Sequence, residues 1–134
     1  MVFGGSQVLM DIEPLVRMIR HDSVVHGTSH TILGALVIGA IAGTAGRPIT
    51  EFALRILHIP HRTLTWTVSF ISSFVGTYSH ILLDAVMHKD MHPLWPLSAR
   101  NGLLGIMPTS WLYILCLATG ALGLAIINLS HKEK

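Results

Sequence analysis

Histidine and carboxylate residues recur at a spacing of four in two parts of the 134-residue chain. His26 and His30 form one pair, and His80, Asp84 and His88 form a second series. Residues four apart lie on the same face of a helix, so each set could present neighbouring ligand atoms. Imidazole together with carboxylate suits zinc, iron or manganese. The pattern therefore predicts a site for a divalent metal ion, with zinc favoured over manganese and iron.

The composition of the chain is that of a membrane protein. Hydrophobic residues make up 51% of the sequence and charged residues only 12%, about half the charged share of an average soluble domain. The net charge of +2 is too small and too scattered to indicate direct nucleic-acid binding. The length predicts one domain, over residues 1–134.

Three segments are apolar enough to cross a lipid bilayer, which takes about 20 residues in a helix. They run from His26 to Ala45, from Leu64 to Met87 and from Trp111 to Leu129. Each is expected to stop at a proline or at charged residues: Arg47–Pro48, Lys89–Asp90 and the tail His131–Lys134. The expected fold is all-α, an integral membrane bundle of about three transmembrane helices, multi-pass in the inner or plasma membrane.

Two shorter helices are expected outside these spans. The segment from Asp11 to Arg20 has the pattern of an amphipathic helix that lies at the membrane interface. Glu51 and Arg55, at positions i and i+4, suggest a short surface helix between the first two spans.

The metal-ligand residue types gather on one side of the membrane if the three spans alternate in direction. The N-terminal segment and the loop from Met87 to Gly102 then share one face. That face receives six of the nine histidines and five of the seven acidic residues. They are His21, His26, His30, His80, His88, His92, Asp11, Glu13, Asp22, Asp84 and Asp90. An ionisable residue such as Asp84 within an apolar helix is costly, and such residues usually mark function.

Several other interpretations of these residues remain open. Asp84 could pair with Arg100 in a structural salt bridge, and His88 and His92 could be solvated loop residues. A metal carrier would need a homo-oligomer, because three spans do not form a path, and its site would usually lie near the midplane. A structural membrane subunit is a further alternative. A di-iron oxygenase or a zinc protease is not favoured, because the sequence contains neither HxxHH nor HExxH.

Three segments resemble a known family, the YdjM-like inner-membrane-associated metal-dependent hydrolases, also described as LexA-binding. The segments are MDIEP at Met10–Pro14, HGTSHTILGA at His26–Ala35, and GTYSHILLDAVMHKDMHPLWP at Gly76–Pro96. They occur in the family's order, and they are most similar to an archaeal-type branch. Members generally begin with a further hydrophobic helix that carries an early histidine. Only MVFGGSQVL precedes the acidic element here, so we expect a member that lacks this helix.

The resemblance implies roles for particular residues. Asp11, His26, His30, His80 and Asp84 match the metal positions, and Glu13, His88 and Asp90 match supporting positions. The implied reaction is hydrolysis of an ester or phosphoester, with an activated water as the nucleophile. Glu13, His88 or Asp90 could serve as the general base, and Arg100 could stabilise a developing anion. A position at the membrane surface favours a lipid or another amphiphilic substrate.

Overall fold

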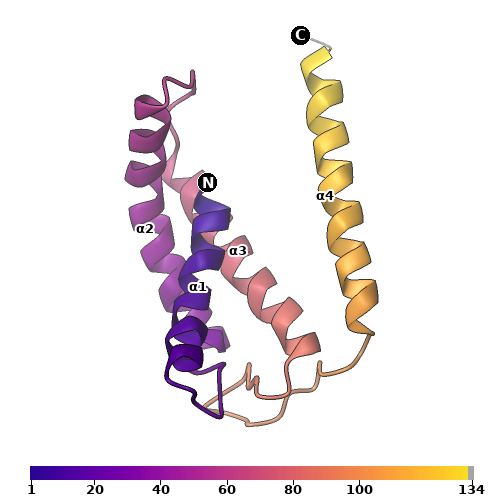
Figure 1. Ribbon diagram of the computed structural model, residues 1–134. Coiled ribbons are helices and arrows are strands. Elements are labelled where there is room, and N and C mark those ends of the chain that lie inside the picture. Colours follow the sequence, from indigo (N-terminus) through magenta and orange to yellow (C-terminus); the bar gives the residue numbers. More distant parts are fainter. Residues whose placement is uncertain (133–134) are drawn as a thin grey trace. The chain divides into compact units, whose positions relative to one another are not determined.

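The computed structural model describes residues 1–132, which form four α-helices and one 3-10 turn, with no strand among them (Figure 1). The all-α prediction is confirmed. The chain divides into two compact units, Met1–Leu104 and a second unit that begins at Gly105. The first unit contains the helices α1, α2 and α3, and it holds every residue of the site described below.

Helix α1 spans Val2–Ile19, so it begins well before the predicted start at Asp11. Its buried residues recur every fourth position, at Val2, Ser6, Met10 and Pro14, and this stripe packs against α2 and α3. The predicted short N-terminal helix is therefore present, but it begins at Val2 instead of Asp11. Within this stripe Ser6 lies against Gly76, where the absence of a side chain lets the two helices approach closely.

Helix α2 spans Ile32–Ile56 and passes through Arg47 and Pro48, which were predicted to end it. Its start is fixed by Thr31, whose hydroxyl oxygen accepts a hydrogen bond from the Gly34 N–H at 2.9 Å. Proline within a membrane helix is tolerated when neighbouring groups satisfy the backbone. The predicted separate helix around Glu51 and Arg55 is the last part of α2.

Helix α3 spans Trp66–Met87, close to the prediction, and Thr65 caps its start. It packs closely on α2 at Gly39 and Gly43. A β-carbon added at Gly39 would lie 2.6 Å from the Phe74 ring, and one added at Gly43 would overlap the Phe70 ring. The Ser69 hydroxyl also donates a hydrogen bond to the Gly43 carbonyl at 2.7 Å.

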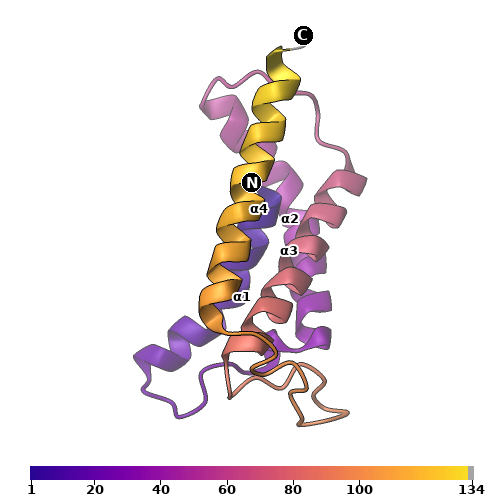
Figure 2. The same cartoon turned by 90° about the vertical axis from the view of Figure 1, so that its right-hand side faces the viewer.

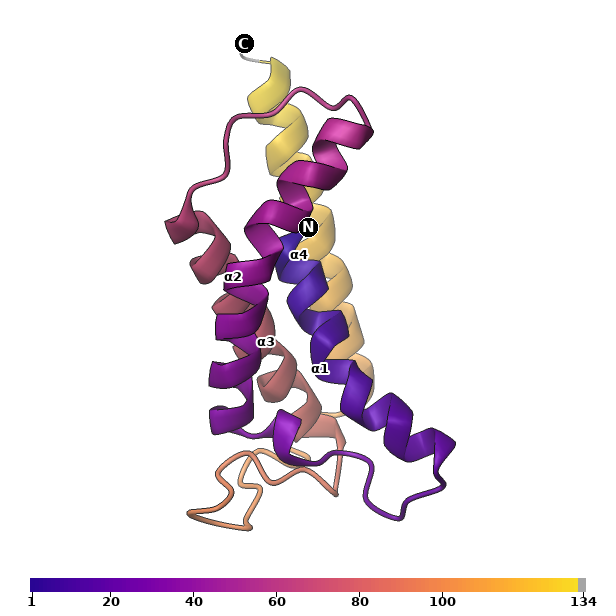
Figure 3. The same cartoon turned by 90° about the vertical axis from the view of Figure 1, so that its left-hand side faces the viewer.

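The end of α1, the start of α2 and the end of α3 lie at the same end of this unit in all three ribbon views (Figures 1, 2 and 3). The backbone N–H groups of Val25 and His26 both bond to Asp90 beyond α3. This contact confirms that the N-terminal segment and the loop after Met87 share one face. A core of Met10, Ala35, Ile81, Ala85 and Met91 packs at this end.

The second unit contains helix α4, which spans Thr109–Lys132. By length and apolar composition, three helices of the described residues could cross a membrane: Ile32–Ile56, Trp66–Met87 and Thr109–Leu129. This confirms the prediction of about three transmembrane helices. Residues 133–134, the end of the predicted charged tail, lie outside the described part of the chain.

Candidate metal centre

The segment that carries His26 and His30 is not helical, contrary to the prediction. His30 ends a 3-10 turn, Thr28–His30, and α2 begins only at Ile32. Helix α1 holds this turn in place, because the carboxylate of Glu13 accepts a hydrogen bond from the Ser29 N–H at 2.7 Å. A β-carbon at Gly34 would overlap the Thr28 and Ser29 carbonyls, so only glycine lets α2 start this close to the turn. The two histidines are placed by a turn and its anchors, not by helical spacing.

Four of the five predicted metal residues converge: Asp11 of α1, His30 of the turn, and His80 and Asp84 of α3. Each offers one ligand atom, and these four atoms all lie within 4.8 Å of one another. The Asp84 Oδ2 atom lies 3.1 Å from His80 Nε2 and 3.4 Å from His30 Nε2. Asp11 Oδ1 approaches His80 Nε2 to 3.2 Å. Here the four-residue spacing of His80 and Asp84 acts as predicted, because both lie on one face of α3.

The two histidine nitrogens at the centre of this group lack hydrogen-bond partners although they are buried. Both Nε2 atoms lie near carboxylate oxygens, but neither forms a hydrogen bond of acceptable geometry. Their opposite ring nitrogens are engaged: His30 Nδ1 lies 2.9 Å from Ser29 Oγ, and His80 Nδ1 lies 3.0 Å from Gln7 Oε1. Buried polar atoms are nearly always paired in folded proteins, so each exception needs a cause.

A divalent cation fits these residues. Metal-bound histidines almost always hold one ring nitrogen on the metal and the other on a hydrogen-bond partner, which fixes the ring. His30 and His80 show this arrangement, with the free nitrogens aimed at a shared carboxylate. Two imidazoles and two carboxylates are also a common donor set for zinc. Asp11 differs from the rest, since its side chain is 60% exposed while that of His30 is fully buried, so the group opens to solvent at Asp11.

The fifth predicted ligand, His26, lies beside the first group and joins a second one with His88 and Asp90. His26 Nε2 is 4.0 Å from Asp84 Oδ2, and the His26 and His88 ring centroids are 4.3 Å apart. The prediction that His88 continues the helical face of His80 and Asp84 is wrong. His88 is the C-cap of α3 in an extended conformation, with φ −106° and ψ 125°, and this turns its ring towards His26.

Asp90 fastens the loop after α3 to the segment before α2. Its Oδ2 atom accepts the N–H groups of Val25 and His26, each at 2.9 Å, and its Oδ1 atom lies 3.0 Å from His26 Nδ1. Burial acts to raise the pKa of Asp90, but the hydrogen bonds from His26 and Val25 outweigh it and lower the pKa to about 2. Such a carboxylate stays ionised and is a poor proton acceptor.

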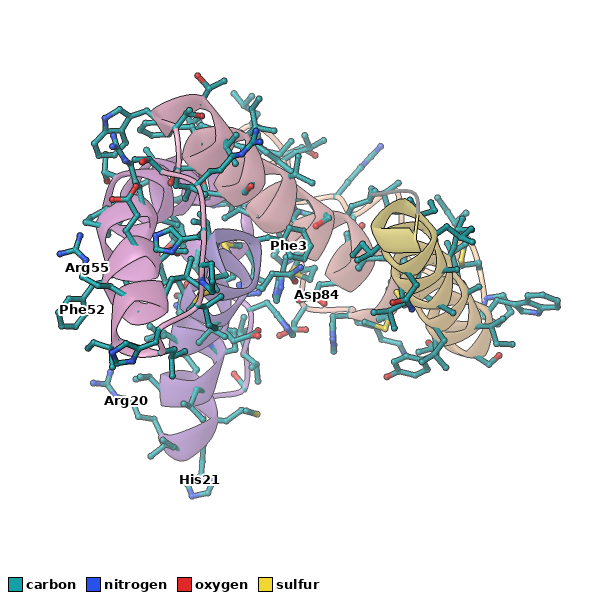
Figure 4. The ribbon with its side chains drawn as sticks, turned by 90° about the horizontal axis from the view of Figure 1, so that it is seen from above. Phe3, Arg20, His21, Phe52, Arg55 and Asp84 are labelled. Atoms are coloured by element: carbon teal, nitrogen blue, oxygen red, sulfur yellow. The ribbon has the colours of Figure 1, made fainter. Side chains whose placement is uncertain are left out.

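Glu13 and Arg100, two further predicted catalytic residues, belong to neither group of ligand atoms. Glu13 forms an ion pair with Arg17 at 2.8 Å. Burial acts to raise the pKa of Glu13, but its bonds with Ser29 and Arg17 lower it below its usual value. Arg100 is exposed, and its backbone N–H bonds to Ser98 Oγ. Figure 4 labels Asp84 on α3, and Arg20 and His21, which follow the end of α1.

Sequence reasoning missed Gln7 and Ser29, which contact the Nδ1 atoms of His80 and His30. Gln7 lies four residues before Asp11 on α1, so the i, i+4 rule would have found it if the helix had been extended to Val2. Ser29 directly precedes His30, and its role depends on the 3-10 turn, which no periodicity indicates.

A cavity of about 160 Å³ adjoins His26. It is lined by Arg17, His26, Gly27, Thr28, Thr31, His92 and Trp95. A larger and more open groove of about 390 Å³ shares Thr28, Thr31 and Trp95 with this cavity and continues along α2 past Leu33 and Val37. A small cavity beside His26 therefore borders a larger groove that runs along a membrane-spanning helix.

Comparison with protein families finds a match over residues 8–133 to the family described as YdjM inner membrane protein. The matched range includes all residues of both ligand groups. No curated protein and no solved structure matches the chain.

Proposed function

The chain belongs to the YdjM inner membrane protein family, and on that premise we propose that it is a membrane-bound, metal-dependent hydrolase. With three apolar helices it is a multi-pass inner-membrane protein. Asp11, His30, His80 and Asp84 would hold the ion, for which zinc is the best fit. The reaction proposed is hydrolysis of an ester or phosphoester of a lipid-like substrate at the membrane face.

One observation carries this proposal more than any other. His30 Nε2 and His80 Nε2 are buried and lack hydrogen-bond partners, yet both point at Asp84 Oδ2. Leaving a buried polar group unsatisfied costs about 1–3 kcal/mol, and the structure carries two such groups side by side. A cation bound between them removes both penalties at once, which a structural role of the histidines would not do.

The residues of the site would have the following roles in the proposed reaction. His30, His80 and Asp84 bind, Ser29 and Gln7 orient the two imidazoles, and Glu13 and Asp90 hold the loops. A bound divalent ion would supply a Lewis acid that makes water a nucleophile near neutral pH. Asp11 would complete the ligand set, and because it is the carboxylate of the group that faces solvent, we also assign it the acceptance of the proton from the attacking water.

The surroundings of the site support an amphiphilic substrate. The cavity beside His26 is of a size for a small polar head group, and the connected groove follows α2 into the apolar span. A head group in the cavity would lie beside His26, and an acyl chain could follow the groove along α2. We therefore prefer lipid phosphoesters and carboxyesters over water-soluble esters.

The depth of the site distinguishes this proposal from metal transport. Asp84 and His80 precede the end of α3, Met87, by one and two turns, which places them about 5 Å and about 10 Å from that end at 1.5 Å per residue. Transport sites usually lie near the bilayer midplane, where broken helices form them. A position near one membrane surface suits an enzyme that takes its substrate from the bilayer.

The test is hydrolysis by the full chain in detergent or vesicles, assayed against phospholipids, other phosphoesters and carboxyesters. We expect cleavage of an amphiphilic member that requires zinc or manganese, stops with chelator and returns with the ion. Asp84→Asn should abolish it. If the metal-loaded protein cleaves no substrate of the panel, the hydrolase proposal fails, and metal flux into proteoliposomes becomes the next measurement.

Replacing Gln7 should weaken metal binding without unfolding the protein. Gln7→Leu keeps the size of the side chain but leaves His80 Nδ1 without its partner at 3.0 Å. Loss of such a supporting contact typically lowers metal affinity by about 10- to 100-fold. The dissociation constant should be measured by competition with a zinc chelator, and Val8→Ala, on the exposed side of α1, is the control. An unchanged affinity would show that Gln7 does not orient a ligand.

A further inference from the structure

We infer that the chain has a second metal position, formed by His26, His88 and Asp90 next to the one proposed above. The inference rests on the proposed first site only in that both positions border Asp84. It gives a role to His88, which the four-residue group does not include.

The second group has the composition and spacing of a metal site. His26, His88 and Asp90 each offer a ligand atom, and these atoms lie within 4.8 Å of one another. The His26 side chain is only 10% exposed, and Asp90 is 28% exposed. Two imidazoles and one carboxylate with an accessible side form the three-ligand set typical of catalytic zinc, which leaves a position for water or substrate.

Asp84 connects the two positions. Its Oδ2 atom lies 3.4 Å from His30 Nε2 in the first group and 4.0 Å from His26 Nε2 in the second. The rings of the histidines follow one another across the site, with centroid distances of 5.2 Å from His80 to His30, 4.9 Å from His30 to His26, and 4.3 Å from His26 to His88. In two-metal hydrolytic sites the ions are about 3.5–4 Å apart, a separation that a carboxylate between the groups can span.

The backbone is built to hold the second group in place. His88 ends α3 and Asp90 follows two residues later. The Asp90 carboxylate in turn fixes the backbone of Val25 and His26. The three side chains therefore belong to one cross-linked pair of segments, so that the ligands are held together before an ion arrives. His92, farther along the same loop, belongs to neither group.

The inference is tested by counting ions. The full chain is saturated with zinc, and unbound zinc is then removed. Elemental mass spectrometry should find two ions per chain in the unmodified protein and one in His88→Ala. His92→Ala is the matched control and should retain two. X-ray absorption of the unmodified protein provides a measurement that needs no variant, because a metal–metal distance of about 3.5–4 Å is expected.

Each outcome has a definite meaning. One ion in the unmodified protein, with no metal–metal scattering, overturns the second position and leaves the proposed first site intact. No ion at all overturns both. Two ions that both survive in His88→Ala and in the conservative His88→Gln would show that the second ion lies elsewhere.

Discussion

Replacing Asp84 by asparagine is expected to abolish metal binding at the first site and to cost all metal-dependent activity. Asp84 Oδ2 lies close to three imidazoles, those of His30, His80 and His26. Asparagine keeps the shape and an acceptor oxygen but removes the negative charge that offsets a divalent cation in a partly buried place. Even the loss of a supporting residue lowers affinity by about 10- to 100-fold, so removal of this ligand should exceed about 100-fold.

The measurement is metal content per chain after purification and reconstitution, together with the zinc dissociation constant. Asp22→Asn removes the same charge from an exposed loop residue outside both groups, and it should bind metal as the unmodified protein does. If Asp84→Asn retained a full complement of metal with similar affinity, the cluster would be a hydrogen-bonded structural feature and the proposed centre would be wrong.

Gly76→Ala is expected to destabilise the first unit and to weaken metal binding together. A β-carbon at Gly76 would overlap Ser6 Oγ and lie 2.9 Å from the backbone carbonyl of Phe3. Because that carbonyl belongs to helix α1, relief requires α1 to move away from α3. Overpacking of this kind costs about 1–3 kcal/mol, more than the gain of up to about 1 kcal/mol that alanine brings over glycine within a helix. The displacement would also shift Gln7 and Asp11, which α1 contributes to the site.

Gly4→Ala, in α1, is the matched control, because nothing lies within 4 Å of a β-carbon at that position. It should leave stability unchanged or raise it slightly. Both variants should be unfolded by denaturant in the same detergent, and their zinc affinity measured in parallel. Equal stability of the two variants would mean that α1 and α3 do not pack as closely as described.

His80 and Asp84 of α3 lie close together as the sequence predicted, and for a physical reason. His80 and Asp84 lie one turn apart in a long apolar helix, and such a helix leaves the two side chains on a common face. The prediction needed no tertiary information beyond the direction of the spans. The prediction failed at His88, because the helix ends there and the backbone becomes extended.

The residues before α2 lie near Asp84 as predicted, but the local backbone geometry was predicted wrongly. His26 and His30 have helical spacing but lie in an irregular segment and a 3-10 turn. The turn is set by Thr31, by Gly34 and by Glu13 of another helix. Long-range anchors of this kind leave no periodic trace in a sequence. Helix α1 was underestimated for a related reason, since its buried stripe includes Ser6, a residue that a hydrophobic pattern does not count.

The bond between Asp90 and the backbone of Val25 and His26 has a consequence for the order in which the protein can be built. The partners are separated by 65 and 64 positions in the chain. During synthesis, the segment before α2 emerges from the ribosome long before Asp90 does, and α2 and α3 must both have entered the bilayer by then. Until that moment His26 lacks this anchor, whereas the contacts of His30 with Ser29 and of His80 with Gln7 involve only residues that precede Asp90. The centre can thus be completed only late in biogenesis, after the helical hairpin has been inserted.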